Sequence, residues 1–348
     1  MRCLVTGNHG YIGYILADEL VKAGYEVTGY DYDYFSDNSF GRKDALKSSG
    51  RIKQISKDLR EIKESDFEGI DAVIHLAALP NDPACDLAPE VTYDINYLAT
   101  LQAAIAAKRA GVKRFIYASS CSVFGVKGDE LINEGDRPSP ITAYGLSKMY
   151  AENALLQMNS RDFTVTCMRN ATCYGVSPRM RFDMVLNNLV GYAYTEGRIR
   201  VLSDGTSWRP IVHIEDVAGA YIAALKAPES DISGQIFAVG SENFTVNEIA
   251  QIVAEVVPGS EIAHNPNAQK DWRSYRVSFN KMIRVLGYRP KWTAKKGAEE
   301  LYKAYKEFGL TKENFQNEQF WAGKHFKSMV NERIIDKDFE FTKKRPKG

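Results

Sequence analysis

The chain has 348 residues, of which 44% are hydrophobic, and a formal net charge of +1. This length can bury one large core and a second, smaller lobe. The near balance of charge excludes a broad electrostatic surface, so we expect neither a nucleic-acid nor a membrane partner. The sequence begins without the apolar stretch of a secretory signal, and no segment has about 18 consecutive apolar residues. Five scattered cysteines match no metal-site spacing, and together these features predict a cytoplasmic protein without a structural metal.

Strand-like and helical patterns alternate along the first half of the chain. A short apolar run at 2–6 precedes a glycine-rich turn, after which Ile12, Leu16 and Leu20 recur at helical spacing. Further runs are typical of strands at 26–30, 71–76, 112–118 and 163–168, and helical patterns fall at 88–110 and 142–159. This alternation predicts an α/β fold with a doubly wound parallel sheet covered by helices.

The pattern loosens beyond residue 170, where glycine and proline interrupt shorter elements. We therefore expect residues 1–170 to form the sheet domain and residues 171–310 to form a smaller α/β lobe that binds the substrate. The run Gln235–Val239 is expected to return to the sheet, so that the two parts are interleaved. Residues 311–348 are predicted to be a helical extension that ends in a charged, solvated tail.

A glycine-rich turn joins the first strand to the first helix. Gly7, Gly10 and Gly13 have the spacing G-x-x-G-x-x-G, a variant of the Rossmann dinucleotide fingerprint. Glycine allows the sharp turn and lets a pyrophosphate approach the backbone N–H groups at the start of the helix, where Tyr11 and Ile12 lie. The turn therefore predicts a dinucleotide site in a Rossmann-type domain.

An acidic residue follows the second strand. Asp31 lies about 20 residues after the glycine turn, where a carboxylate accepts hydrogen bonds from the adenosine ribose, and no arginine is adjacent to bind a 2′-phosphate. This favours NAD over NADP. His75, within an apolar run, is expected to be packed and not catalytic. The later strand ends add further candidate cofactor contacts, namely Asp58, Leu59, Leu76, Ala77 and Ala78.

Tyr144 and Lys148 are four residues apart in a predicted helix, so they share one face. A nearby Lys ammonium and the positive charge of an oxidised nicotinamide would both favour the phenolate of Tyr144, which could then act as a base. Tyr302 and Lys306 repeat this spacing, and we interpret them as helix surface. Position separates the two pairs, because Ser120 ends a predicted parallel strand 24 residues before Tyr144, at the edge where such sheets bind ligands.

Taken together, these motifs resemble the extended short-chain dehydrogenase/reductase family, in its nucleotide-sugar epimerase and dehydratase branch that includes UDP-glucose 4-epimerases. The resemblance covers residues 1–295. Its motifs here are Thr6–Gly13, Ser119–Gly125, Tyr144–Lys148 and Arg209–Asp216.

The resemblance implies roles for individual residues. Ser120 and Tyr144 would orient and deprotonate a sugar hydroxyl, Lys148 would bind the nicotinamide ribose, and Arg209 would bind the substrate diphosphate. Asn96 and Ser119 are further expected cofactor contacts. The remaining expected substrate contacts are Cys121, Ser122, Thr172, Val201 and the pair Asn187 and Asn188, of which one resembles the family's nucleotide-binding asparagine.

Two departures from the family pattern bear on the reaction. In 4,6-dehydratases an Asp and a Glu follow the central Ser or Thr, because loss of water needs a second acid and base. Here these residues are Cys121 and Ser122, which argues against dehydration. Thr172 replaces a typical asparagine, and Ser177–Arg181 with its two arginines could compensate.

These features predict an NAD-dependent nucleotide-sugar 4-epimerase that acts through a transient 4-keto sugar. A nucleotide-sugar C-4 dehydrogenase or 4-keto reductase shares every motif and stays open. A 4,6-dehydratase, a reductase of free small molecules and a non-catalytic NAD-binding scaffold fit less well. The resemblance also implies a homodimer formed through 88–110 and 142–159.

Overall fold

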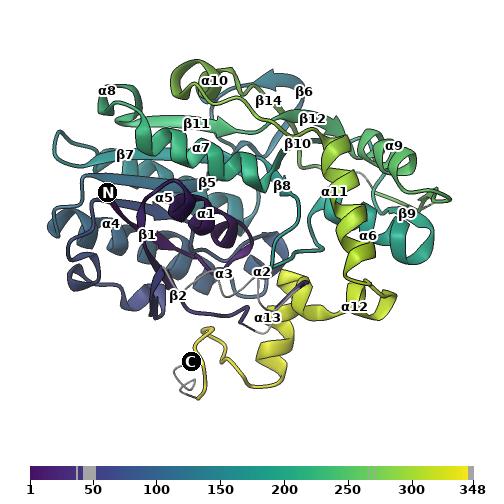
Figure 1. The fold of residues 1–348 in the computed structure, drawn as a ribbon, viewed down its shortest axis with the longest axis horizontal. Helices are drawn as coiled ribbons and strands as arrows, with labels where there is room; N and C mark the ends of the chain where they lie inside the picture. Colours follow the sequence, from purple (N-terminus) through teal and green to yellow (C-terminus); the bar gives the residue numbers. More distant parts are fainter. Residues whose placement is uncertain (37, 42–51, 266, 270, 344–348) are drawn as a thin grey trace.

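A parallel sheet of seven strands forms the centre of the molecule in the computed structural model, which describes residues 1–343 apart from 37, 42–51, 266 and 270 (Figure 1). The strand order is β11-β7-β5-β4-β1-β2-β3. The chain thus moves outward from β1 in both directions, as in a Rossmann fold. The strands are β1 (Arg2–Thr6), β2 (Glu26–Asp31), β3 (Ile52–Ser56), β4 (Ala72–His75), β5 (Arg114–Ser120), β7 (Thr164–Asn170) and β11 (Gln235–Val239).

The central strands are apolar on both faces because helices cover both sides of the sheet. Successive side chains point to opposite faces, so Cys3 and Val5 enter one core while Leu4 enters the other. The first core lies under α1 (Tyr11–Lys22) and α7 (Ile214–Lys226). The second lies under α3 (Pro89–Tyr93), the π-helical segment η4 (Asp94–Ala99), α4 (Thr100–Arg109) and α5 (Ala143–Gln157). The predicted doubly wound parallel fold is therefore confirmed.

A smaller lobe is built from segments after residue 170, together with one strand from the first 170 residues. Three short sheets form it: β8 (Thr172–Tyr174) with β10 (Trp208–His213) and β12 (Glu242–Thr245), β9 (Arg198–Val201) with β13 (Glu261–His264), and β6 (Val126–Ile132) with β14 (Ser274–Val277). Its main helices are α6 (Val185–Glu196), α9 (Val246–Val256) and α11 (Ala294–Glu307). Because β11 pairs in parallel with β7, the chain returns from this lobe to the main sheet.

Shorter helices connect these elements. They are η2 (Leu59–Glu61), η3 (Glu64–Phe67), α2 (Asp82–Cys85), η5 (Cys121–Phe124), α8 (Glu229–Ile232) and α10 (Asn280–Leu286). None of the helices in the described part of the chain is long and apolar enough to span a bilayer.

The C-terminal extension differs from its prediction. It is helical in α12 (Lys312–Gln316), η6 (Glu318–Phe320) and α13 (Ala322–Asn331), but then continues as an irregular segment closed by a bridge between Ile335 and Phe341. It is not a solvated tail up to residue 343, because Phe326 and Phe339 are buried against the second core. Residues 344–348, which hold most of the basic terminus, lie outside the described residues.

Candidate active site

A cavity of about 700 Å³ lies at the carboxyl ends of the central strands, between the main sheet and the smaller lobe. It includes the point where the sheet order reverses between β1 and β4, the usual ligand site of an open parallel sheet. The predicted cofactor contacts that line it are Gly7, Gly10, Tyr11, Ile12, Gly13, Asp31, Asp58, Leu59, Leu76, Ala77, Ala78, Ser119, Tyr144 and Lys148. The predicted substrate contacts that line it are Ser120, Ser122, Thr172, Asn188 and Arg209.

The glycine turn leaves no room for side chains. A Cβ on Gly13 would lie 2.0 Å from the carbonyl oxygen of Gly7, and a Cβ on Gly7 would lie 2.8 Å from the backbone nitrogen of Ala77. Gly7 also has a φ of +73°, which favours glycine. This close packing presents bare backbone to the cavity at the start of α1, the arrangement that accepts a dinucleotide pyrophosphate.

Asp31 is held at the cavity wall by the backbone. Its carboxylate accepts hydrogen bonds from the N–H groups of His9 at 2.9 Å and Asp33 at 2.8 Å, and the His9 ring contacts the Asp33 carboxylate. Burial raises the pKa of Asp31, while the charge of His9 acts in the opposite direction. The position of Asp31 at the end of β2 fits recognition of an adenosine ribose.

His75 is a structural residue, as the sequence predicted. Its ring is fully buried, and its two nitrogens lie 3.0 Å from the hydroxyl oxygens of Thr6 and Thr100. The Thr6 hydroxyl in turn accepts a hydrogen bond from the N–H of Ala77. Burial lowers the pKa of His75 to about 3, so the ring is neutral and braces the strand ends beneath the cofactor region.

The catalytic candidates converge on the same cavity from two elements. Ser120 ends β5, whereas Tyr144 and Lys148 lie on α5, which begins after the N-cap Thr142. The Ser120 hydroxyl lies 2.9 Å from that of Ser122 and also hydrogen-bonds to Tyr144. The structure thus brings together the serine and tyrosine that the sequence places 24 residues apart.

Burial sets the direction of the pKa shifts of Tyr144 and Lys148. Burial raises the pKa of Tyr144, and the hydrogen bond from Ser120 offsets only part of that effect. The Lys148 ammonium donates to the carbonyl oxygen of Ala118 at 3.0 Å, and burial lowers its pKa to about 8. Desolvation is thus the largest influence on the pKa of Tyr144 within the chain, and the expectation that Lys148 and the nicotinamide favour the phenolate stays a prediction.

Four predicted site residues do not line the cavity in the described part of the chain, and these predictions are corrected here. Cys121 is buried with its thiol directed at the carbonyl oxygen of Arg169. Asn187 is buried and hydrogen-bonds to Tyr11 and Gly175, whereas its neighbour Asn188 faces the cavity. Val201 packs into the core, and Asn96 holds the backbone of Leu79.

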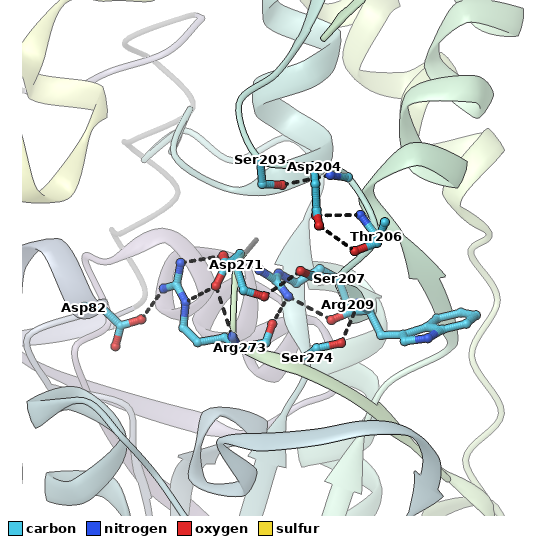
Figure 2. Close-up of polar contacts among 11 residues, drawn as sticks. Asp82, Ser203, Asp204, Thr206, Ser207, Arg209, Asp271, Arg273 and Ser274 are labelled. Atoms are coloured by element: carbon cyan, nitrogen blue, oxygen red, sulfur yellow. Dashed lines mark hydrogen bonds and ion pairs between the residues drawn. The ribbon is translucent and has the colours of Figure 1, made fainter. Parts of the chain in front are cut away.

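Arg209 belongs to a charged cluster that the sequence reasoning only half identified (Figure 2). Asp271 lies between Arg209 and Arg273, at 2.5 Å from the former and 2.8 Å from the latter, and Arg273 reaches across to Asp82 at 2.5 Å. All four side chains line the cavity. Burial acts to raise the pKa of Asp271, but the hydrogen bond from Arg273 and the two guanidinium charges hold it below its usual value.

A further arginine pair, within the segment Ser177–Arg181, also lines the cavity. The Arg181 guanidinium pairs with Asp183 through two contacts of 3.0 Å. Arg179 donates to the backbone carbonyl oxygens of Phe35 and Ser36 at 2.7 and 2.8 Å, and so holds the loop after β2. Arg179 therefore fixes backbone, whereas Arg181 forms an ion pair with Asp183 in the cavity wall.

The fold, the glycine turn and the Ser-Tyr-Lys group define an extended short-chain dehydrogenase/reductase. Comparison with known proteins agrees. The model of the NAD dependent epimerase/dehydratase family matches residues 3–240. The chain belongs to this family, and its cofactor is NAD.

The relatives carry out more than one reaction. The chain is 28% identical to UDP-glucose 4-epimerase of Bacillus subtilis over 333 residues, which cover 86% of this chain and 94% of that protein. It is 25% identical to UDP-glucuronic acid decarboxylase 1 of Danio rerio, covering 92% and 75%. Among solved structures it is similar to UDP-glucuronic acid 4-epimerase of Bacillus cereus in complex with UDP-glucuronic acid and NAD, with 26% identity, a TM-score of 0.77, and 88% and 99% coverage.

Proposed function

We propose that this protein is an NAD-dependent nucleotide-sugar 4-epimerase. The observation that carries the proposal is which polar groups line the cavity with Tyr144, and which of them are already paired. The Ser120 hydroxyl hydrogen-bonds to the phenol and is itself bonded to Ser122, whereas every carboxylate that lines the described cavity is held by another group. Such a site can move a proton to and from one sugar hydroxyl without offering a second acid and base.

The partners of these carboxylates are specific. Asp31 accepts backbone N–H groups, and Asp58 pairs with Arg60 at 2.6 Å. The other three are paired with arginines, namely Asp183 with Arg181, Asp271 with Arg209 and Arg273, and Asp82 with Arg273. In a 4,6-dehydratase, the two residues after the central Ser or Thr are the Asp and Glu that serve as second acid and base at the sugar C-5 and C-6. In this sequence the two residues after Ser120 are Cys121 and Ser122.

The chain's own residues supply the proton chemistry. Tyr144 removes the proton of the sugar C-4 hydroxyl and later returns it, and Ser120 holds the reacting oxygen by a hydrogen bond. A bound NAD would supply the hydride acceptor and donor, and its positive charge would act against the raised pKa of Tyr144. Lys148 holds its ammonium next to Ala118, at the end of β5 where a ribose would lie. The 4-keto sugar must rotate in the pocket between the two hydride transfers. The pocket must therefore have room for more than one orientation of the sugar.

Arginines at the far end of the cavity fit a diphosphate. Arg209 and Arg273 share one carboxylate, so a diphosphate with more negative charge could replace Asp271 between the two guanidinium forks. Asn188 faces the cavity from α6 and is a candidate contact for the nucleotide. Thr172 also lines the cavity and is a candidate contact for the sugar.

The test is to incubate the purified protein with a panel of nucleotide sugars and no added cofactor, and to follow the configuration at C-4 by NMR. Interconversion of two C-4 epimers supports the proposal. Stoichiometric NADH production or consumption would instead identify a dehydrogenase or a reductase, and loss of carbon dioxide would identify a decarboxylase. No change at C-4 in any sugar overturns the epimerase assignment.

A tyrosine substitution tests the proposed base. Tyr144→Phe should lower turnover by about 10²–10⁴-fold while NAD binding is kept, because only the proton-transfer group is lost. Tyr302→Phe is the matched control, since Tyr302 has a lysine at the same spacing but does not line the described cavity. An active Tyr144→Phe variant would contradict the role of Tyr144.

The proposal includes a homodimer and a cytoplasmic location. Large apolar side chains are exposed on one helical layer, with Leu98 53%, Ile105 44% and Tyr150 42% exposed on η4, α4 and α5. A second copy would cover them. Sedimentation of the wild type and Leu98→Lys tests this, because the charge should produce monomers only if this face is the interface.

The cysteines bear on the proposed location. All five are unpaired and buried, which fits a reducing compartment.

A further inference from the structure

The C-terminal segment reaches the adenosine end of the NAD site. We use the name C-terminal clasp for residues 322–343, which comprise α13 and the bridged segment after it (Figure 1). Its residue Phe326 lines the same cavity as Asp31, Asp58 and Leu59. In a Rossmann fold the ends of β2 and β3 face the adenosine half of the dinucleotide, so Phe326 lies on that half of the site.

Aromatic contacts hold the clasp against the loop that follows β2. The ring of Phe326 meets that of Tyr34 edge-on, with centroids 5.1 Å apart, and stacks on Phe339 at 5.1 Å. The ring of Phe341 meets that of Tyr32 edge-on, with centroids 4.9 Å apart. Because both Tyr32 and Tyr34 line the cavity, the clasp sets the position of two further wall residues.

Hydrogen bonds fix the clasp to the same loop and to η2. The Tyr34 hydroxyl donates to the carbonyl oxygen of Phe339 at 2.6 Å, and His325 hydrogen-bonds to the Tyr34 carbonyl oxygen at 2.8 Å. Arg60 donates to the carbonyl oxygen of Asp338 at 2.7 Å while it pairs with the cavity residue Asp58. The clasp is therefore tied to groups on both sides of the adenosine region.

We propose that the C-terminal clasp forms the outer wall of the adenosine site, with Phe326 as its contact to the cofactor, and that it slows the release of NAD. The chemistry is that of an aromatic and aliphatic wall against a purine and its ribose, to which Phe326 contributes its ring from within the buried cluster of the clasp. The inference goes beyond the proposed function, because it concerns how long the cofactor stays bound and not what happens to the sugar. It suits an epimerase, in which the same NAD is used in every cycle.

A role in packing alone is the competing explanation, because Phe326 is also part of a buried cluster. Met329 separates the two explanations. It lies on the same helix α13, is equally buried and packs in the same cluster, but it does not line the described cavity. Loss of either side chain should destabilise the clasp, but only the loss of Phe326 removes a wall of the site.

The experiment measures NAD content after purification and the NAD dissociation rate after dilution, in the wild type, Phe326→Ala and Met329→Ala, with unfolding temperatures as the stability readout. We expect Phe326→Ala to speed NAD dissociation by about tenfold or more, and Met329→Ala to change it by less than about threefold. If Phe326→Ala does not fold, Phe326→Leu keeps an apolar side chain in the cluster and should still release NAD faster than Met329→Ala.

Equal dissociation rates for the Phe326 and Met329 variants, whether both fast or both unchanged, would overturn the proposal. The measurement uses NAD alone and no sugar, so it is independent of the reaction. A wild type that retains NAD but epimerises no sugar would refute the proposed function and leave the clasp intact. A wild type that epimerises, together with a Phe326→Leu variant that retains NAD like the wild type, would support the proposed function and refute the role of the clasp.

Discussion

The two ends of the cavity are built on different principles. The glycine turn of the cofactor end consists of backbone and small residues packed too closely for any side chain, as at Gly7 and Gly13. The substrate end consists of long charged side chains, Arg209, Arg273 and Arg181, each paired with a carboxylate. Under the proposed function, the first end is complete before its ligand arrives, whereas the second must exchange protein carboxylates for ligand phosphates.

This difference predicts different responses to mutation. Close packing has no alternative arrangement, so a single methyl group at the cofactor end should abolish binding. Ion pairs can be remade with another partner, so changes at the substrate end should weaken binding by degrees. The predictions below are ordered by the size of the expected effect.

Gly13→Ala should give the largest effect. Its Cβ would fall 2.0 Å from the carbonyl oxygen of Gly7, so the turn must shift and the pyrophosphate site is lost. We expect no NAD in the purified protein and at least about a hundredfold weaker NAD binding by calorimetry. Gly135→Ala is the control, because it has no positive φ and only a side-chain oxygen at 3.2 Å near its Cβ. Normal NAD binding by Gly13→Ala would break the distinction between the two ends.

Arg209→Lys should give an intermediate effect confined to the substrate end. An ammonium keeps the charge but loses the two-pronged geometry, so the affinity for UDP should fall by about tenfold to a hundredfold while NAD content stays unchanged. Arg276→Lys is the matched control. Arg276 stacks on Trp208 with its guanidinium 4.5 Å from the ring centre and does not line the described cavity. A loss of NAD in Arg209→Lys would mean that the two ends are not independent.

His75 should produce the smallest effect, and only in acid. Its pKa is lowered from 6.5 to about 3 by burial, so the unfolded chain binds a proton below pH 6.5 that the folded protein does not. The stabilisation by neutral His75 is thus present above pH 6.5 and is lost as the pH falls toward 3. Between pH 6.5 and 5.5 this should remove about 1 kcal/mol from the free energy of unfolding.

The measurement is urea denaturation of the wild type and His75→Gln at both pH values. The glutamine keeps polar atoms near Thr6 and Thr100 but cannot titrate, so its stability should fall less between the two pH values. An identical pH dependence in both proteins would show that His75 is charged, or is not buried in solution.

The sequence predicted the cofactor end far better than the substrate end, for a physical reason. The glycine turn, Asp31 and Tyr144 are located by local rules of strand, turn and helix, which leave little freedom. On the substrate side, the prediction named two residues whose sequence neighbours line the cavity in their place, because successive side chains of a helix or strand point in different directions. Asn187 and Asn188 differ by about 100° around α6, and Val201 alternates with Arg200 and Leu202, which do line the cavity.

Cys121 and Arg273 illustrate the remaining errors. Cys121 lies in the short turn η5, which directs its thiol into the core while Ser120 and Ser122 face the cavity. Arg273 comes 64 residues after Arg209 in a region without regular spacing, so only the folded lobe brings them to one carboxylate. An Asp-x-Arg pattern just before β14 was the one available signal. The division of the chain at residues 170 and 310 stays a prediction.

The Asp183 carboxylate joins parts of the chain that lie far apart in the sequence. One of its oxygens accepts hydrogen bonds from Arg181, from the amide of Asn81 at 2.8 Å and from the N–H of Ala322 at 3.1 Å. Three segments from distant parts of the gene thus depend on a single carboxylate. Loss of this carboxylate would therefore disturb the cavity wall at Arg181, the loop at Asn81 and the start of α13 together.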